Sequence, residues 1–195
     1  NAVIYANSVL GARTLKIPDY LDLFVAMTGR APYCGTYADS GRQARRIVEL
    51  AAVPTDVDDG FWPLLGWVLG KLSPDRIPLL RGLEEMNVDD DAMKAVCAAF
   101  GSTSGAPMLH IAGHTPEAGM PSAPAADRVT IDREMLADAW RQLNSGGADI
   151  DLVAIGSPHL SLAELHLIDA AFEGRHCHAD VKLILTIGRD VLDIA

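Results

Sequence analysis

A chain of 195 residues in which 49% are hydrophobic and 22% are charged has the composition of a globular protein, with room for one sizeable core or two small ones. The formal net charge of −10 repels phosphate backbones and anionic lipid, so nucleic-acid and membrane partners are not expected. The three cysteines, Cys34, Cys97 and Cys177, lie far apart and in no metal-binding spacing, which favours a reducing, cytoplasmic compartment over a disulfide scaffold.

Helical patterns dominate the first half of the chain. Residues 18–29 (PDYLDLFVAMTG) begin with a proline in the first turn and end at a glycine, and both are typical helix boundaries. Three further helical stretches follow with short connections between them. The predicted elements of this half are helices at 18–29, 42–52, 60–72 and 89–101, and a strand at 76–80.

Strands and helices alternate in the second half, which predicts a parallel sheet. Residues 151–156 (DLVAIG) form a continuous apolar run suited to a strand buried on both faces. Ser161 and Glu164 have the spacing of a capping box at the start of the next helix. The predicted elements are strands at 106–113, 128–131, 151–156 and 180–187, helices at 131–144 and 161–174, a helix start at 189, and a loop over 113–128.

These patterns predict an α/β fold with a helix-rich part at residues 1–104 and a βαβαβ part at residues 105–195. The chain begins without methionine and stops just inside a predicted helix. We therefore expect it to be a fragment of a larger multidomain protein.

Ser157 and His159 flank a proline directly after the apolar run 151–156. In open α/β sheets, ligands bind at the carboxyl ends of strands, where the next helix presents unpaired N–H groups. The two side chains are therefore candidate ligand contacts. The alternative is a tight turn in which proline stiffens the backbone, serine caps it and histidine is merely exposed.

A second polar cluster lies in residues 5–14 (YANSVLGART). Arg13 offers a planar fork for a carboxylate or phosphate, and Asn7 and Ser8 can hydrogen-bond a substrate or a metal-bound oxygen. A turn stabilised by Asn7 is the alternative.

A third stretch is LHIAGHTPEA (109–118). His110 alternates with apolar residues and is expected in the core, whereas His114 and Glu117 are either an acid/base pair or the start of a helix. The run RHCHAD near Cys177 is expected to be an exposed loop, because adjacent residues rarely converge on one metal ion.

Three stretches, YANSVLGART, LHIAGHTPEA and DLVAIGSPHLSLAEL, resemble in their order and spacing the large-subunit region of the aconitase X family. Two further segments, MTGRAPYCG and LTIGRDV, also look like segments of that family. The resemblance covers essentially the whole chain. One departure is Gly188, where the family tends to have serine before the arginine.

The resemblance implies an aconitase-like layered α/β fold, and a small swivelling domain supplied elsewhere in the same chain or by a second subunit. It also implies an iron–sulfur cluster held by three cysteines. One of them belongs to a GCPH motif, which here reads Gly156-Ser157-Pro158-His159. A serine hydroxyl is a harder ligand than a thiolate and has a higher pKa. We therefore expect Ser157 to bind iron through oxygen, or a cluster that is smaller or differently held, or no cluster.

Dehydration of a hydroxy acid is the chemistry that the resemblance implies. Arg13 or Arg189 would hold the substrate carboxylate, and Asn7 and Ser8 would hydrogen-bond the substrate or its departing hydroxyl. Ser157 and His159 would line the metal side, so we assign Ser8, Arg13 and His159 as catalytic, Asn7 and Arg189 as substrate-binding, and Ser157 as metal-binding.

Two substrates are known in this family, cis-3-hydroxy-L-proline, which gives pyrroline-2-carboxylate, and phosphomevalonate. The serine at position 157 and the lack of a basic cluster for a phosphate favour the first. The other hypotheses are a non-catalytic, partner-binding subunit and a generic α/β domain that binds a small molecule. We expect the isolated fragment to be inactive, because catalytic parts lie outside it.

Overall fold

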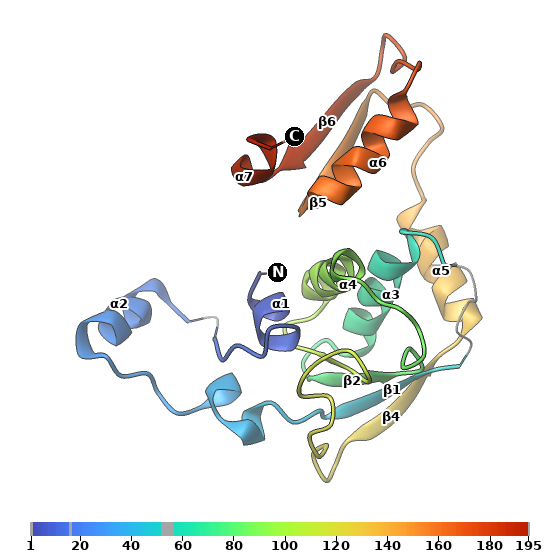
Figure 1. Ribbon diagram of the computed structural model, residues 1–195. Coiled ribbons are helices and arrows are strands. Elements are labelled where there is room, and N and C mark those ends of the chain that lie inside the picture. The colour runs from blue at the N-terminus through green and yellow to red at the C-terminus, as the bar shows by residue number, and fades with distance from the viewer. Residues whose placement is uncertain (1, 16, 52–56, 195) are drawn as a thin grey trace. The chain divides into compact units, whose positions relative to one another are not determined.

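The structure is a computed structural model that describes residues 2–15, 17–51 and 57–194. The chain divides into two compact units, Asn1–Leu143 and Asn144–Ala195, and each is described by itself (Figure 1).

The first unit is built on a four-stranded parallel sheet. Its strands are β1 (Arg46–Leu50), β2 (Pro78–Arg81), β3 (His110–Ile111) and β4 (Asp127–Ile131). The strand order is β3-β2-β1-β4, so β1 pairs with both β2 and β4. Two of these strands follow residue 105 in sequence and two precede it. The units therefore do not divide at the expected boundary after residue 104.

The strand β1 replaces a helix that the sequence pattern predicted at residues 42–52, and that prediction is wrong. Val48 is fully buried and pairs with Leu80 on one side and with Val129 on the other. A central parallel strand is buried on both faces, and the β-branched pair Ile47-Val48 suits that environment better than a helix. Residue 52, the expected end of the helix, lies outside the described residues.

Four helices pack against the sheet and one another. They are α1 (Ala2–Ser8), α3 (Phe61–Leu72), α4 (Asp90–Thr103) and α5 (Arg133–Leu143). Helices α3 and α4 lie side by side (Figure 1), and a Cβ atom at Gly66 would lie only 2.4 Å from the carbonyl oxygen of Val96. Glycine is therefore needed for the close approach of these two helices. Among the described residues, no helix is both long and apolar enough to cross a membrane.

The chain between α1 and β1 contains α2 (Asp19–Thr28) and two short 3₁₀ helices, η1 (Gly35–Tyr37) and η2 (Asp39–Gly41). As predicted, α2 ends at a glycine, and the structure has this Gly29 in the left-handed conformation, with φ 64°. Helix α2 contains no buried residue and stands apart from the sheet of this unit (Figure 1).

The second unit contains β5 (Leu152–Leu160), α6 (Leu162–Phe172), β6 (Lys182–Ile187) and α7 (Arg189–Leu192). The two strands are parallel and form a sheet of their own, so the predicted parallel pairing is confirmed but is divided between two sheets. The predicted capping box is also confirmed. The hydroxyl of Ser161 accepts from the N–H of Glu164, and the Glu164 carboxylate accepts from the N–H of Ser161.

Strand β5 was expected to end at residue 156, but it continues through a bulge to Leu160. Ile155 pairs with Leu185, and the next pair is Leu160 with Ile187. An advance of five residues along β5 therefore corresponds to two along β6. The extra residues make Gly156–His159 bulge from the sheet, a feature often found beside active sites.

Candidate functional site

Asn7 is fully buried at the end of α1, and its side-chain amide makes four hydrogen bonds. Its Nδ2 donates to the carbonyls of Thr14 and Pro107, both at 3.1 Å. Its Oδ1 accepts from the backbone N–H of Thr14 at 2.9 Å and from the Thr14 hydroxyl at 3.2 Å. Four bonds use the full capacity of an amide. Asn7 therefore holds the loop after α1 and has no hydrogen-bonding group left for a ligand.

Ser8 follows Asn7 and is also buried, with 1% of its surface exposed. Its Oγ accepts a hydrogen bond of 3.0 Å from the backbone N–H of Leu109, directly before β3. Asn7 and Ser8 together tie the end of α1 to residues 107–109. We expected both side chains to contact a substrate, whereas in the structure both contact other parts of the first unit.

Arg42 is the most fully enclosed charged residue of this cluster, with none of its side chain exposed. Its Nη1 donates to the carbonyls of Ala12 (3.1 Å) and Thr36 (3.2 Å), and its Nη2 donates to the carbonyl of Asn7 (2.9 Å). Its Nε donates to Glu117 Oε2 at 2.6 Å, and its Nη2 lies 2.5 Å from the same oxygen. The buried charge is therefore both paired and fully hydrogen-bonded, as a buried guanidinium must be.

The sequence pattern placed Arg42 on the face of a helix and did not single it out. Arginine is almost never fully buried unless it is paired. Its partner Glu117 lies 75 residues away. No local pattern could reveal this pairing, because the loop after β3 brings the carboxylate to the guanidinium.

Arg13 lies at the partly exposed side of the same cluster, with 38% of its side chain exposed. Its Nη1 donates to the carbonyl of Tyr37 at 2.8 Å, and its Nη2 contacts Asp39 Oδ1 at 2.5 Å and Glu117 Oε1 at 3.4 Å. The hydrogen bond that Arg13 donates to Asp39 raises the pKa of Arg13 above its ordinary value, and the charge of Glu117 acts in the same direction. The cluster therefore contains a permanently cationic, solvent-accessible fork of the kind that binds carboxylates.

His110 is buried, as the sequence predicted, and its Nε2 lies 2.7 Å from the carbonyl oxygen of Arg42. A carbonyl only accepts hydrogen bonds, so the proton is on Nε2. The Nδ1 atom is one of the buried atoms without a hydrogen-bond partner in the described part of the chain. Burial lowers the pKa of His110, which keeps the ring neutral.

The expected acid/base pair of His114 and Glu117 does not form in the structure. The Nε2 atom of His114 lies 2.7 Å from the carbonyl of Leu83, whereas Glu117 binds Arg42 and Arg13. Residues 113–119 form turns rather than the alternative helix start.

In the second unit, Ser157 and His159 lie on the bulge of β5 and both are exposed. The bulge requires Gly156, which has φ 124° and whose Cβ would lie 2.4 Å from the carbonyl oxygen of Thr186. Arg189 is the first residue of α7, directly after β6, and it is also exposed. Because Leu160 pairs with Ile187, the structure brings all three candidates to the carboxyl end of this sheet.

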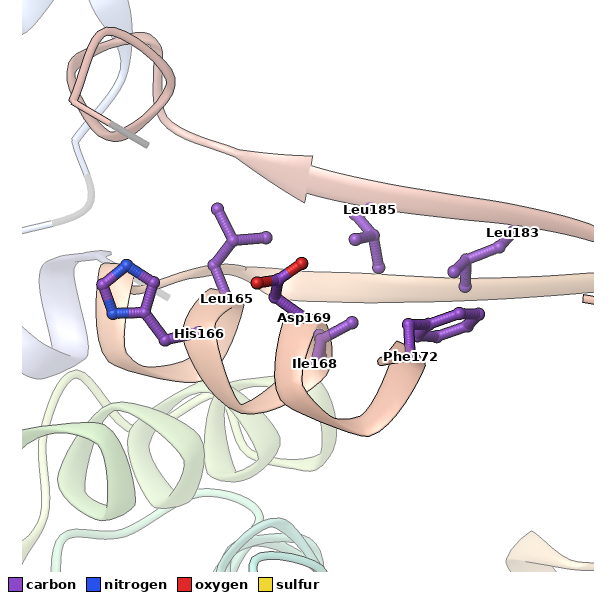
Figure 2. Close-up of a pocket in the computed structure, with 7 residues that line it drawn as sticks. All are labelled: Leu165, His166, Ile168, Asp169, Phe172, Leu183 and Leu185. Atoms are coloured by element: carbon purple, nitrogen blue, oxygen red, sulfur yellow. The ribbon is translucent and has the colours of Figure 1, made fainter. Parts of the chain in front are cut away.

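A hollow of about 380 Å³ lies between α6 and β6 in the second unit. Figure 2 shows Leu183 and Leu185 of β6 directed toward α6, with Phe172 at one end of the hollow and His166 at the other. Asp169 adds a carboxylate, and the other lining residues apart from His166 are apolar (Figure 2). None of the predicted site residues lines this hollow.

The described residues do not fit a complete iron–sulfur site. They contain no group of three or more His, Cys, Asp or Glu side chains that could hold a metal ion. Cys34 and Cys177 are exposed, whereas Cys97 is buried in the core of the first unit. Burial raises the pKa of Cys97 to about 12, and its thiol packs among apolar side chains of that core rather than beside other metal-binding groups of the described residues.

Two family descriptions match this chain. "Aconitase X first domain" matches residues 1–40, and "Aconitase X second domain" matches residues 44–141. Together they cover the sheet of the first unit and its polar cluster apart from Arg42, which lies between the two matched ranges.

Relatives of known activity match over nearly the whole chain. The cis-3-hydroxy-L-proline dehydratase of Pseudomonas aeruginosa is 44% identical over 198 residues, which is 98% of this chain and 34% of the relative. The phosphomevalonate dehydratase large subunit of Methanocaldococcus jannaschii is 30% identical over 186 residues, which is 93% of this chain and 46% of the relative. The chain therefore spans between a third and a half of the length of these relatives.

A solved structure matches the fold. The crystal structure of Thermococcus kodakaraensis aconitase X in its holo-form aligns with a TM-score of 0.86 and 29% identity, over 100% of this chain and 49% of that chain. The expected α/β fold with a parallel sheet is confirmed.

Proposed function

Because the chain belongs to the aconitase X family, we propose that it is part of a hydro-lyase that converts cis-3-hydroxy-L-proline to pyrroline-2-carboxylate. The observation that carries the choice of substrate is the difference in identity between the two kinds of relative. The sequence identity is 44% to the hydroxyproline dehydratase and 30% to the phosphomevalonate dehydratase large subunit, each over nearly the whole chain.

The proposed reaction makes three demands on the protein. The proton leaves the carbon that bears the carboxylate, and the hydroxyl leaves the neighbouring carbon with a proton, which yields a ring double bond and one water. Negative charge builds on the carboxylate as the first proton leaves, so a cation near it lowers the barrier. A base must take that proton, and an acid or other electrophile must assist the departing hydroxyl.

In the first unit, we assign Arg13 to bind the substrate carboxylate. It is cationic, partly exposed, and held by contacts to Tyr37, Asp39 and Glu117. Asn7 and Ser8 support it from the buried side, because they fix the ends of the loop that carries Arg13. Their contribution to catalysis in this proposal is to position the loop.

Ser157, His159 and Arg189 are the groups that we assign in the second unit. The imidazole of His159 can donate a proton to the departing hydroxyl, and the Ser157 hydroxyl can hydrogen-bond it. Arg189 offers a second cation at the same end of the sheet. We place the base outside this chain, in the small swivelling domain.

The proposal extends to cofactor, partner and compartment. An iron–sulfur cluster of the whole protein would draw its thiolates from outside the described residues, with Ser157 at the position where the family carries a cysteine, so no step is assigned to it here. The small swivelling domain is the expected partner, since the archaeal relative is named as a large subunit. Three unpaired cysteines suit a reducing cytoplasm.

The test uses the full-length protein with cis-3-hydroxy-L-proline, and follows pyrroline-2-carboxylate by NMR. Phosphomevalonate is the parallel substrate. We expect turnover of the first compound, and a fall of at least roughly tenfold in kcat/KM for Arg13→Ala and for His159→Ala. Turnover of phosphomevalonate alone would overturn the choice of substrate, and no turnover of either would favour the non-catalytic alternative.

A further inference from the structure

Arg13 contacts two carboxylates whose surroundings differ. The Asp39 side chain is 71% exposed, whereas that of Glu117 is 21% exposed. An ion pair between exposed groups is weak, because water and salt screen it and because two mobile side chains must be held together. The contact to Asp39 is therefore easily exchanged.

Glu117 is held on its other side by Arg42. One carboxylate oxygen, Oε2, receives the Nε and Nη2 of Arg42, which leaves Oε1 facing Arg13. Arg42 is fully buried, and removal of its only carboxylate partner among the described residues would leave a charge without compensation. Glu117 therefore keeps its position, and the Arg13 guanidinium has one permanent carboxylate neighbour and one exchangeable one.

The backbone around Asp39 is anchored, whereas its side chain is 71% exposed to solvent and contacts Arg13. The Asp39 carbonyl accepts a hydrogen bond of 3.0 Å from the N–H of Arg42 at the end of η2. Rotation of the Asp39 side chain therefore uncovers the Arg13 guanidinium without moving the helix.

We propose that Asp39 occupies, in the substrate-free protein, the position on Arg13 that the substrate carboxylate takes, and that it is displaced when substrate binds. This inference rests on the proposed function and adds a residue that sets the affinity for the acid. With Asp39 bound, two arginines face two carboxylates, Asp39 and Glu117. Exchange of one carboxylate for another leaves this balance of charge unchanged.

The geometry also allows the substrate carboxylate to bind Arg13 more strongly than Asp39 does. Within the described part of the chain, hydrogen bonds use three of the five N–H groups of Arg13, and Asp39 takes one of them. A carboxylate that approaches from solvent can accept from two N–H groups at once, which is the stronger arrangement. Displacement therefore replaces a single contact with a bidentate one.

The test compares Asp39→Asn with Asp75→Asn in the full-length protein. Asp75 is a matched control, because it is 67% exposed, bonds Arg76 at 2.8 Å, and changes charge by the same amount. We expect Asp39→Asn to lower the KM for cis-3-hydroxy-L-proline by roughly two- to fivefold, the effect of removing one exposed competing ion pair. We expect kcat to change less than twofold, and Asp75→Asn to leave both constants unchanged.

A second readout is the dissociation constant of L-proline, which carries the carboxylate but no hydroxyl, measured by calorimetry. It should fall by the same factor in Asp39→Asn. A KM that is unchanged or raised in Asp39→Asn would overturn the inference, because Asp39 would then not compete with the substrate. Absence of turnover by the unaltered protein would instead overturn the proposed function and the inference with it.

Discussion

The substitution Glu117→Gln tests whether the buried Arg42 depends on its distant carboxylate. Glutamine keeps the shape and one oxygen acceptor but removes the negative charge. Arg42 then lies fully buried without a counter-ion, while its bonds to the carbonyls of Asn7, Ala12 and Thr36 remain. Breaking a buried pair by removing one partner costs about 3–5 kcal/mol. That is a large fraction of the roughly 5–15 kcal/mol that stabilises a typical domain.

The measurement is the free energy of unfolding of the full-length protein by urea. Glu49→Gln is the matched control, because it is the same substitution at a carboxylate that is 40% exposed and bonds the exposed Arg128 at 3.0 Å. We expect the control to cost less than about 1 kcal/mol. The double variant Arg42→Met, Glu117→Leu should recover part of the loss, because it leaves no charge unpaired.

Equal losses for Glu117→Gln and Glu49→Gln would refute this reasoning. They would mean that water reaches Arg42 and that the pair behaves as a surface ion pair. A double variant less stable than Glu117→Gln would also refute it, since packing and hydrogen bonds to carbonyls would then outweigh the unpaired charge.

Three further outcomes follow from the contacts described above. Asn7→Ala should lower the free energy of unfolding by about 2–4 kcal/mol in urea denaturation, because partly buried groups of Thr14 and Pro107 lose their hydrogen-bond partners. A loss below about 1 kcal/mol would contradict a structural role. The Cys97 thiol, whose pKa burial raises to about 12, should resist a thiol reagent at pH 8 in the folded protein and react on unfolding, because the thiolate is the nucleophile. Fast labelling of Cys97 in the native protein, shown by mass spectrometry, would contradict its burial. Gly156→Ala should disrupt the β5 bulge, because the new methyl group would overlap the carbonyl of Thr186, and faster hydrogen exchange confined to β5 and β6 would report it.

Much of the local structure could be read from the sequence. The capping box of α6, the glycine that ends α2, and the helices α3 to α5 depend on contacts within a few residues, and all formed where they were predicted. The helix expected at residues 42–52 did not form, because contacts with distant residues decide the structure of this segment. Pairing of β1 with strands on both sides, from distant parts of the chain, overrode its local pattern.

The candidate site residues could also be predicted only in part from the sequence. The sequence singled out Asn7, Ser8 and Arg13 because polar residues gather there, and it singled out Ser157 and His159 because they follow an apolar strand. It could not distinguish the saturated amide of Asn7 from the accessible guanidinium of Arg13, since their partners Pro107, Tyr37 and Glu117 come from elsewhere in the chain.

Arg42 illustrates both what the sequence determines and what only the tertiary structure decides. Its residue type and position are plain in the sequence, yet its burial depends on Glu117, 75 residues away, and on carbonyls from α1, the loop after it, and η1. Local propensities act between neighbours along the chain, and they determined most of the helices. Burial, ion pairing and exposure depend on which distant segments meet, so only the tertiary structure decided which polar residues hold the loop and which face solvent.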